Sequence, residues 1–116
     1  MMNTDRELLE LAAKAAGVEY FIRDSGYKWE IRTGTPADGY YKQEDDSCEW
    51  NPLTDDGDAL RLAVKLELDI GINRPNAVCI DLDKDNWIVE YKNSDPYAAT
   101  RRAIVRAAAE IGKEQP

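Results

Sequence analysis

The sequence predicts a single α+β domain over residues 1–116, in which an antiparallel sheet of about four to five strands packs with helices as a helix–sheet–helix sandwich. Three observations predict it. Helical periodicity occurs at both ends and in the middle of the chain, and β-type runs joined by turn residues lie between these segments. No apolar run approaches the roughly 20 residues that span a bilayer. With 116 residues, 43% hydrophobic and 33% charged, the chain is typical of one modest core.

The first helix is predicted to start at an Asn3 or Thr4 cap and to end at Gly17. Its buried stripe is expected to comprise Leu8, Leu11, Ala12 and Ala15.

The middle helix is predicted over residues 55–66, with Thr54 as its N-cap. Leu60, Ala63 and Val64 are expected on one side of this helix, and Arg61 and Lys65 on the other.

The last helix is predicted to begin at Asp95-Pro96 and to end at Gly112. Its inward face is expected to carry Tyr97, Ile104, Ala108 and Ile111. On the solvent side, Arg106 and Glu110 are spaced as an i,i+4 ion pair.

Five β-type runs complete the element list, namely 18–23, 27–32, 70–73, 77–82 and 87–92. The first two and the last two are predicted hairpins, and 33–53 is predicted to be a long loop. Trp87, Val89 and Tyr91 alternate with Ile88 and Glu90, which indicates a sheet half buried on one face and partly covered on the other.

The acidic run Asp55-Asp56-Gly57-Asp58 is too contiguous for a calcium loop, and its position before an apolar run favours a helix start. A second acidic run, 81–86, lacks the glycine and the closing acid that such a loop needs. The chain has no histidine, and Cys48 and Cys79 are too few for a disulfide framework or a zinc site. We therefore expect no metal, no cofactor and no catalytic residue. The alternative is a hydrolase that uses carboxylates alone, but no pair of acids is singled out by the sequence.

The net charge of −8 is concentrated between residues 38 and 58, where eight acids face one lysine and give −7. This charge disfavours direct binding of nucleic acid and favours a basic partner. The alternative is that a solvated acidic loop only keeps the protein soluble. Tyr40 and Tyr41 lie inside this stretch and either anchor an interface or pack the loop onto the body. The predicted partner-binding residues are Asp38, Tyr40, Tyr41, Glu44, Asp45, Asp46 and Glu49.

Two motifs carry a family resemblance: WNPLTDDGDALRLA at residues 50–63 and DPYAATRRAIV at residues 95–105. Together they resemble the small phage and prophage proteins of the phage ABA sandwich domain family. The resemblance implies a helix–sheet–helix sandwich and transfers no catalytic residue. Each motif lies at the start of a helix, so we expect the acidic first turn of the middle helix to contact Arg101 or Arg102 of the last helix.

The resulting hypothesis is a phage-encoded interaction module that binds a basic surface of a host protein. An inhibitor that competes with DNA for the basic groove of a CRISPR-type defence complex is the favoured form. The alternative is a small-ligand or nucleotide binder whose aromatic residues line a pocket between sheet and helices; a minor virion or replication component is a third possibility. Because the first residues do not resemble a secretory signal, we expect the protein in the cytoplasm of the host cell.

Overall fold

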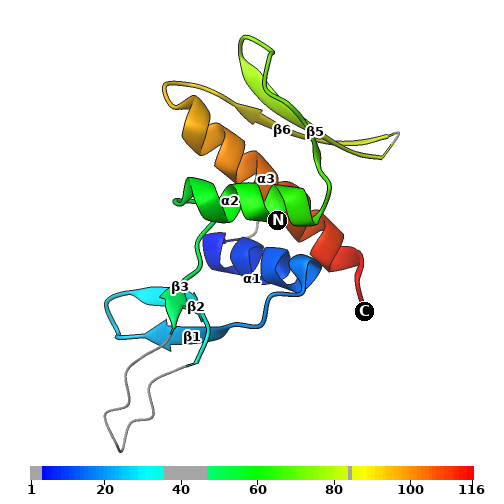
Figure 1. Cartoon of the computed structure of the whole chain (residues 1–116). Helices are drawn as coiled ribbons and strands as arrows, with labels where there is room; N and C mark the ends of the chain where they lie inside the picture. Colours follow the sequence, from blue (N-terminus) through cyan, green and yellow to red (C-terminus); the bar gives the residue numbers. More distant parts are fainter. Residues whose placement is uncertain (1–3, 36–46, 84) are drawn as a thin grey trace, which may run out of the picture.

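The computed structural model describes residues 4–35, 47–83 and 85–116. Within these residues the chain forms three helices and two three-stranded antiparallel sheets, so the α+β class is confirmed. The single sheet of four to five strands is wrong, because the strands divide into two smaller sheets. Figure 1 shows these sheets on opposite sides of the helices.

Helix α1 (Asp5–Ala16) and helix α3 (Pro96–Glu114) pack directly against each other. Thr4 caps α1 by accepting a hydrogen bond from the Glu7 N–H (3.2 Å), and Gly17 ends the helix with φ of 68°. Asp95 caps α3 as predicted, but α3 continues two residues beyond Gly112. Both helices bury small side chains, namely Ala12, Ala13 and Ala16 in α1 and Ala103, Ala107 and Ala108 in α3.

The buried faces of the helices differ in part from those predicted. In α1, Leu8 and Ala12 are buried as expected, whereas Leu11 and Ala15 are only half-buried. In α3, Ile104 and Ala108 are buried, but Tyr97 is 70% exposed because it lies at the start of the helix, beyond the core.

Helix α2 (Asp56–Lys65) is capped by Asp55, not Thr54: the Asp55 carboxylate accepts from the Asp58 N–H at 2.9 Å. The predicted stripe is wrong in part: Ala63 is buried, but Leu60 is 64% and Val64 is 68% exposed. The buried apolar side chains of α2 are Ala59, Leu62 and Ala63.

The first sheet contains β1 (Phe21–Asp24), β2 (Trp29–Thr33) and β3 (Cys48–Glu49). It confirms the first hairpin and adds β3 where the sequence predicts only loop. Arg32 joins β2 to the residue before β3, because its guanidinium donates to Ser47 Oγ at 2.8 Å and to the Ser47 carbonyl at 2.9 Å. The same guanidinium bonds to Glu30 at 2.8 Å and, with Lys28 nearby, holds the pKa of Glu30 below its ordinary value.

The second sheet contains β4 (Asp69–Gly71), β5 (Ala77–Asp83) and β6 (Asn86–Tyr91), in the order β4-β5-β6, and confirms the second hairpin. Its inner face packs on α3, where Val78, Ile80 and Ile88 are at most 5% exposed. Arg106 strengthens this contact by binding Glu90 and the Val89 carbonyl of β6. The predicted Arg106–Glu110 pair is therefore replaced, and Glu110 accepts from Lys113.

Candidate functional site

The predicted partner-binding surface lies almost wholly outside the described residues. Asp38, Tyr40, Tyr41, Glu44, Asp45 and Asp46 belong to the segment 36–46, which is not described. Glu49 is described: it is exposed in β3, in register with Arg32 of β2. This surface therefore stays a prediction.

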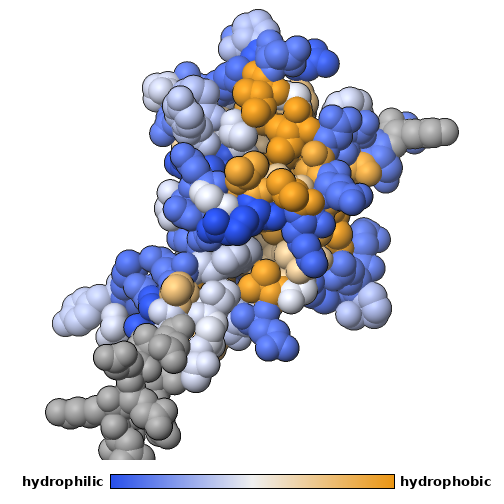
Figure 2. All heavy atoms as spheres, in the orientation of Figure 1, coloured by the Kyte–Doolittle hydropathy of each residue, from blue (hydrophilic) through white to orange (hydrophobic). Residues whose placement is uncertain are grey.

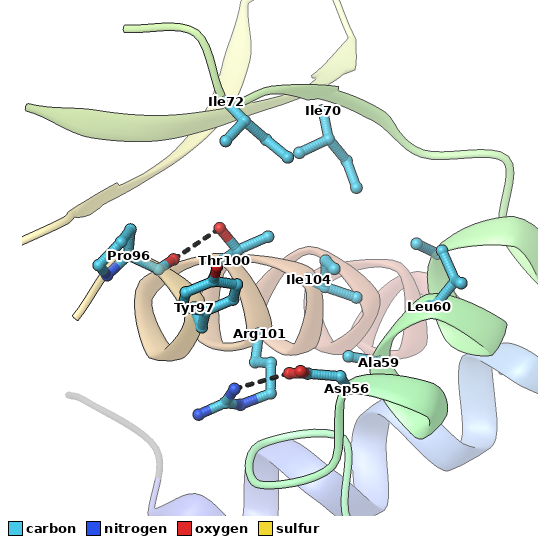
Figure 3. Close-up of a pocket in the computed structure, with 11 residues that line it drawn as sticks. Asp56, Ala59, Leu60, Ile70, Ile72, Pro96, Tyr97, Thr100, Arg101 and Ile104 are labelled. Carbon is cyan, nitrogen blue, oxygen red and sulfur yellow. Dashed lines mark hydrogen bonds and ion pairs between the residues drawn. The ribbon is translucent and has the colours of Figure 1, made fainter. Parts of the chain in front are cut away.

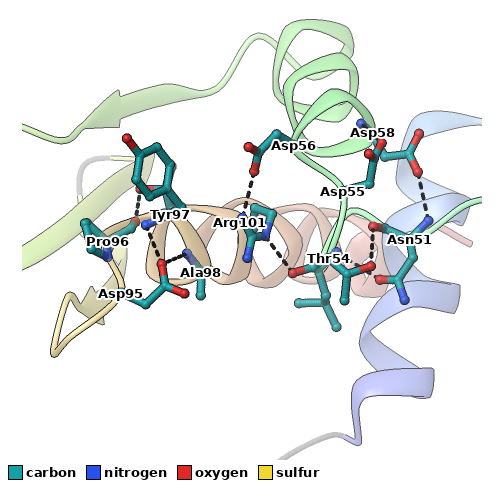
Figure 4. A network of polar contacts seen from close by, with 12 residues as sticks. Asn51, Thr54, Asp55, Asp56, Asp58, Asp95, Pro96, Tyr97, Ala98 and Arg101 are labelled. Atoms are coloured by element: carbon teal, nitrogen blue, oxygen red, sulfur yellow. Dashed lines mark hydrogen bonds and ion pairs between the residues drawn. The ribbon is translucent and has the colours of Figure 1, made fainter.

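Three acids of the same charged stretch have structural roles (Figure 4). Asp55 caps α2, and Asp56 pairs with Arg101 of α3 at 2.7 Å. Asp58 pairs with Arg61 at 2.7 Å and accepts from the Asn51 N–H at 3.0 Å. Part of the −7 charge is thus matched by the chain's own arginines.

The expected contact between α2 and α3 is confirmed for Arg101, whose Nε also donates to the Leu53 carbonyl at 2.8 Å. Arg102 pairs instead with Asp5 of α1 at 3.1 Å. The N-terminal parts of α2 and α3 are therefore joined by one guanidinium.

A first candidate site is the outer face of the second sheet, which points away from α3. The strand register brings its side chains together in rows across the sheet. We define the outer sheet face as Asp69, Cys79, Asp81, Trp87, Val89 and Tyr91.

The exposure of this face is high for such large apolar groups. Trp87 is 53%, Val89 is 39% and Tyr91 is 67% exposed. A contiguous exposed group of aromatic and aliphatic side chains on a folded sheet is typical of an interaction surface. The alternation of these residues was visible in the sequence, but their exposure depends on which face α3 covers.

Two carboxylates lie beside these aromatic residues. Asp81 of β5 is directly opposite Asp69 of β4 on one side and Trp87 of β6 on the other. Within the described residues, Asp81 Oδ1 is buried without a hydrogen-bond partner. Like charges placed opposite each other across a sheet are destabilising unless a cation separates them. The row Asp69–Asp81–Trp87 therefore favours a positively charged group.

A second candidate site is a groove of about 460 Å³ between α2, α3 and β4, which the sequence analysis did not locate. Figure 2 shows apolar side chains gathered over α2 and toward the second sheet. Ile70 and Ile72 point from the sheet toward the helices, opposite Leu60 and Ile104 (Figure 3). We define the α2–α3 groove by its lining residues Asp56, Ala59, Leu60, Ala63, Ile70, Ile72, Pro96, Tyr97, Thr100, Arg101 and Ile104.

Three polar side chains of this groove, those of Asp56, Thr100 and Arg101, are bonded to partners within the chain. Arg101 pairs with Asp56, and the Thr100 hydroxyl donates to the Pro96 carbonyl at 2.8 Å (Figure 3). The alanines of α2 explain the hollow, because Ala59 and Ala63 carry only a methyl group where they face β4 and α3. The groove therefore offers an apolar surface whose charges cancel.

Among residues 4–35, 47–83 and 85–116, no three Cys, Asp or Glu side chains are grouped so that they could hold a metal ion. Over the same residues, no helix combines the length and apolar character needed to cross a membrane. Comparison of the chain with protein-family models, curated proteins and solved structures found no match. Function is therefore inferred from the outer sheet face and the α2–α3 groove.

Proposed function

We propose that the protein is an interaction module that binds a basic partner through the outer sheet face. The single observation that carries this proposal is the row Asp69–Asp81–Trp87, with Val89 and Tyr91 exposed beside it. An arginine or lysine of the partner would lie over this row, near the two carboxylates and against the Trp87 ring. This position combines charge pairing with a cation–π contact, which contributes about 0.5–2 kcal/mol.

The exposed apolar groups give this surface the composition of an interface. Aromatic side chains such as Trp87 and Tyr91 are enriched among residues that dominate binding energy, while surrounding charges guide association. A net charge of −8 also opposes pairing with a second copy of the chain. A cationic partner fits both the local and the total charge.

The broader hypothesis remains part of this proposal. A phage-encoded, cytoplasmic module of this charge would act on a basic host protein, and occupying the nucleic-acid groove of a CRISPR-type complex is the favoured form. The acids of residues 38–49 would add to the overall negative charge that attracts such a partner. Assignment to the sandwich fold of the phage ABA family rests on the two motifs that open α2 and α3.

The proposal predicts that Asp69→Asn with Asp81→Asn weakens binding of an amphipathic peptide of alternating arginine and leucine. The loss of two charge contacts should lower affinity about five- to tenfold and reduce its salt dependence, as measured by fluorescence anisotropy. Glu19→Gln with Glu114→Gln changes the net charge equally at exposed sites and is expected to have less than about a twofold effect. A matching glutamate–leucine peptide should not bind.

A second pair of variants separates aromatic anchoring from charge. Trp87→Ala should weaken the same peptide by about fivefold or more, whereas Tyr27→Ala removes a fully exposed aromatic side chain from the first hairpin and should change little. Neutral replacements of Glu44, Asp45, Asp46 and Glu49 should mainly slow association. If they abolish binding while the outer-face variants bind normally, the acidic segment is the site and the proposal is wrong.

A further inference from the structure

We propose that the α2–α3 groove binds an uncharged, mainly apolar small molecule, independently of the outer sheet face. Ile70 of β4 and Ile72, just after the strand, line the groove, whereas Asp69 of the same strand belongs to the outer sheet face on the other side. The two sites therefore share an element and no side chain.

The size and lining of the groove support a small ligand. Its volume of about 460 Å³ lies within the range of about 300–1,000 Å³ typical of ligand pockets. Ala59, Ala63 and Ile104 form apolar surface on the two helices, and Ile70 and Ile72 face them from the sheet side. The exposed part of the lining is Leu60, Ile72 and Tyr97, at 64%, 49% and 70%, and a mainly apolar molecule would remove these side chains from water on binding.

The charge balance of the groove selects an uncharged ligand. Arg101 is only 18% exposed and is held by Asp56 and by the Leu53 carbonyl. An anionic group placed near Arg101 would also meet the Asp56 carboxylate, and a cationic group would meet the guanidinium. Moving either charge from water into the apolar lining would cost more free energy than its attraction to one member of the Arg101–Asp56 pair would contribute. The same argument disfavours a nucleotide, whose phosphates need an uncompensated positive charge.

Two fluorescent probes with one aromatic skeleton test this inference. N-phenyl-1-naphthylamine is uncharged, and 8-anilino-1-naphthalenesulfonate adds a sulfonate to the same rings. We expect the uncharged probe to bind with one-to-one saturation and at least about tenfold more tightly than the sulfonate. Equal binding of both probes, or binding without saturation, would overturn the proposal.

Matched variants on α2 locate the binding. Leu60 and Val64 are similarly exposed, but only Leu60 lines the groove. Leu60→Glu should weaken the uncharged probe at least about tenfold, while Val64→Glu, with the same change in charge, should leave it within about twofold. Ala63→Leu should fill the groove and have the same effect as Leu60→Glu. Since Ala63 is buried, a thermal melt must show that the Ala63→Leu variant folds. If this variant does not fold, the result for Leu60→Glu decides the test.

Other occupants give different results. Failure of the uncharged probe, together with concentration-dependent dimerisation that Leu60→Glu abolishes, would assign the groove to a second copy of the chain and overturn the proposal. Sedimentation velocity measures this dimerisation. Loss of peptide binding by the outer-face variants would not affect the probe result, so the two proposals fail separately.

Discussion

At the residue scale, Gly112 determines how closely α3 approaches α1. A Cβ added at this position would overlap the Leu11 carbonyl group of α1, which is backbone and has no side-chain rotamer to escape into. The close contact of these helices, with alanine on both sides, therefore requires glycine here. Because α3 also supports the second sheet, this contact determines where both candidate sites lie.

Gly112→Ala should lower the free energy of unfolding by about 1–3 kcal/mol, because the helices must separate to admit the methyl group. Gly57→Ala is the matched control: its added Cβ would meet the Arg61 guanidinium at 3.2 Å, which can move, and Asp55 Oδ2 at 3.4 Å, an ordinary contact distance. A gain of about 0.5–1 kcal/mol is expected there from the lower backbone entropy of the unfolded chain. Urea denaturation measures both values, and equal stability of the two variants would contradict the packing argument.

At the element scale, the starts of α2 and α3 are joined by Arg101. Its guanidinium connects the Leu53 carbonyl, just before α2, with the Asp56 carboxylate in the first turn of α2. The neighbouring Arg102 is more exposed, at 36% against 18% for Arg101, and pairs with Asp5. The two adjacent arginines therefore differ in burial and in whether a backbone carbonyl depends on them.

Arg101→Met should cost about 1–2 kcal/mol of unfolding free energy, since it leaves the half-buried Leu53 carbonyl without its donor. Arg102→Met removes an exposed ion pair and should cost less than about 0.5 kcal/mol. Thermal or urea unfolding of the two variants provides the comparison. A larger loss for Arg102→Met would show that Arg101 does not join the helices in this way.

Helix positions and hairpins could be predicted because caps, turn residues and periodicity are local. The buried face of α2 could not, since its apolar residues lie on most sides of the helix. Leu60 and Val64 are larger than Ala59 and Ala63, yet close packing of α2 on α3 selects the alanines. Packing through the alanines leaves Leu60 exposed and creates the α2–α3 groove. This groove therefore depends on tertiary packing, which the periodicity of the sequence does not encode.

At the scale of the whole molecule, strand number was predicted better than sheet number. Local pairing signals identify hairpins, but they do not indicate whether two hairpins join edge to edge. The helices separate them here, and each hairpin recruits a short third strand, β3 or β4. The acidic run at residues 55–58 was predicted as a helix start, and Asp55, Asp56 and Asp58 do serve capping and ion pairing at the start of α2.

The central claim is that a basic partner binds the outer sheet face, and an NMR titration of the isotope-labelled chain with the arginine–leucine peptide tests it most directly. The account predicts that the largest amide shift changes occur at Cys79, Asp81, Val89 and Tyr91. Changes confined to residues 36–49, or to the α2–α3 groove, with the amides of β5 and β6 unaffected, would contradict it.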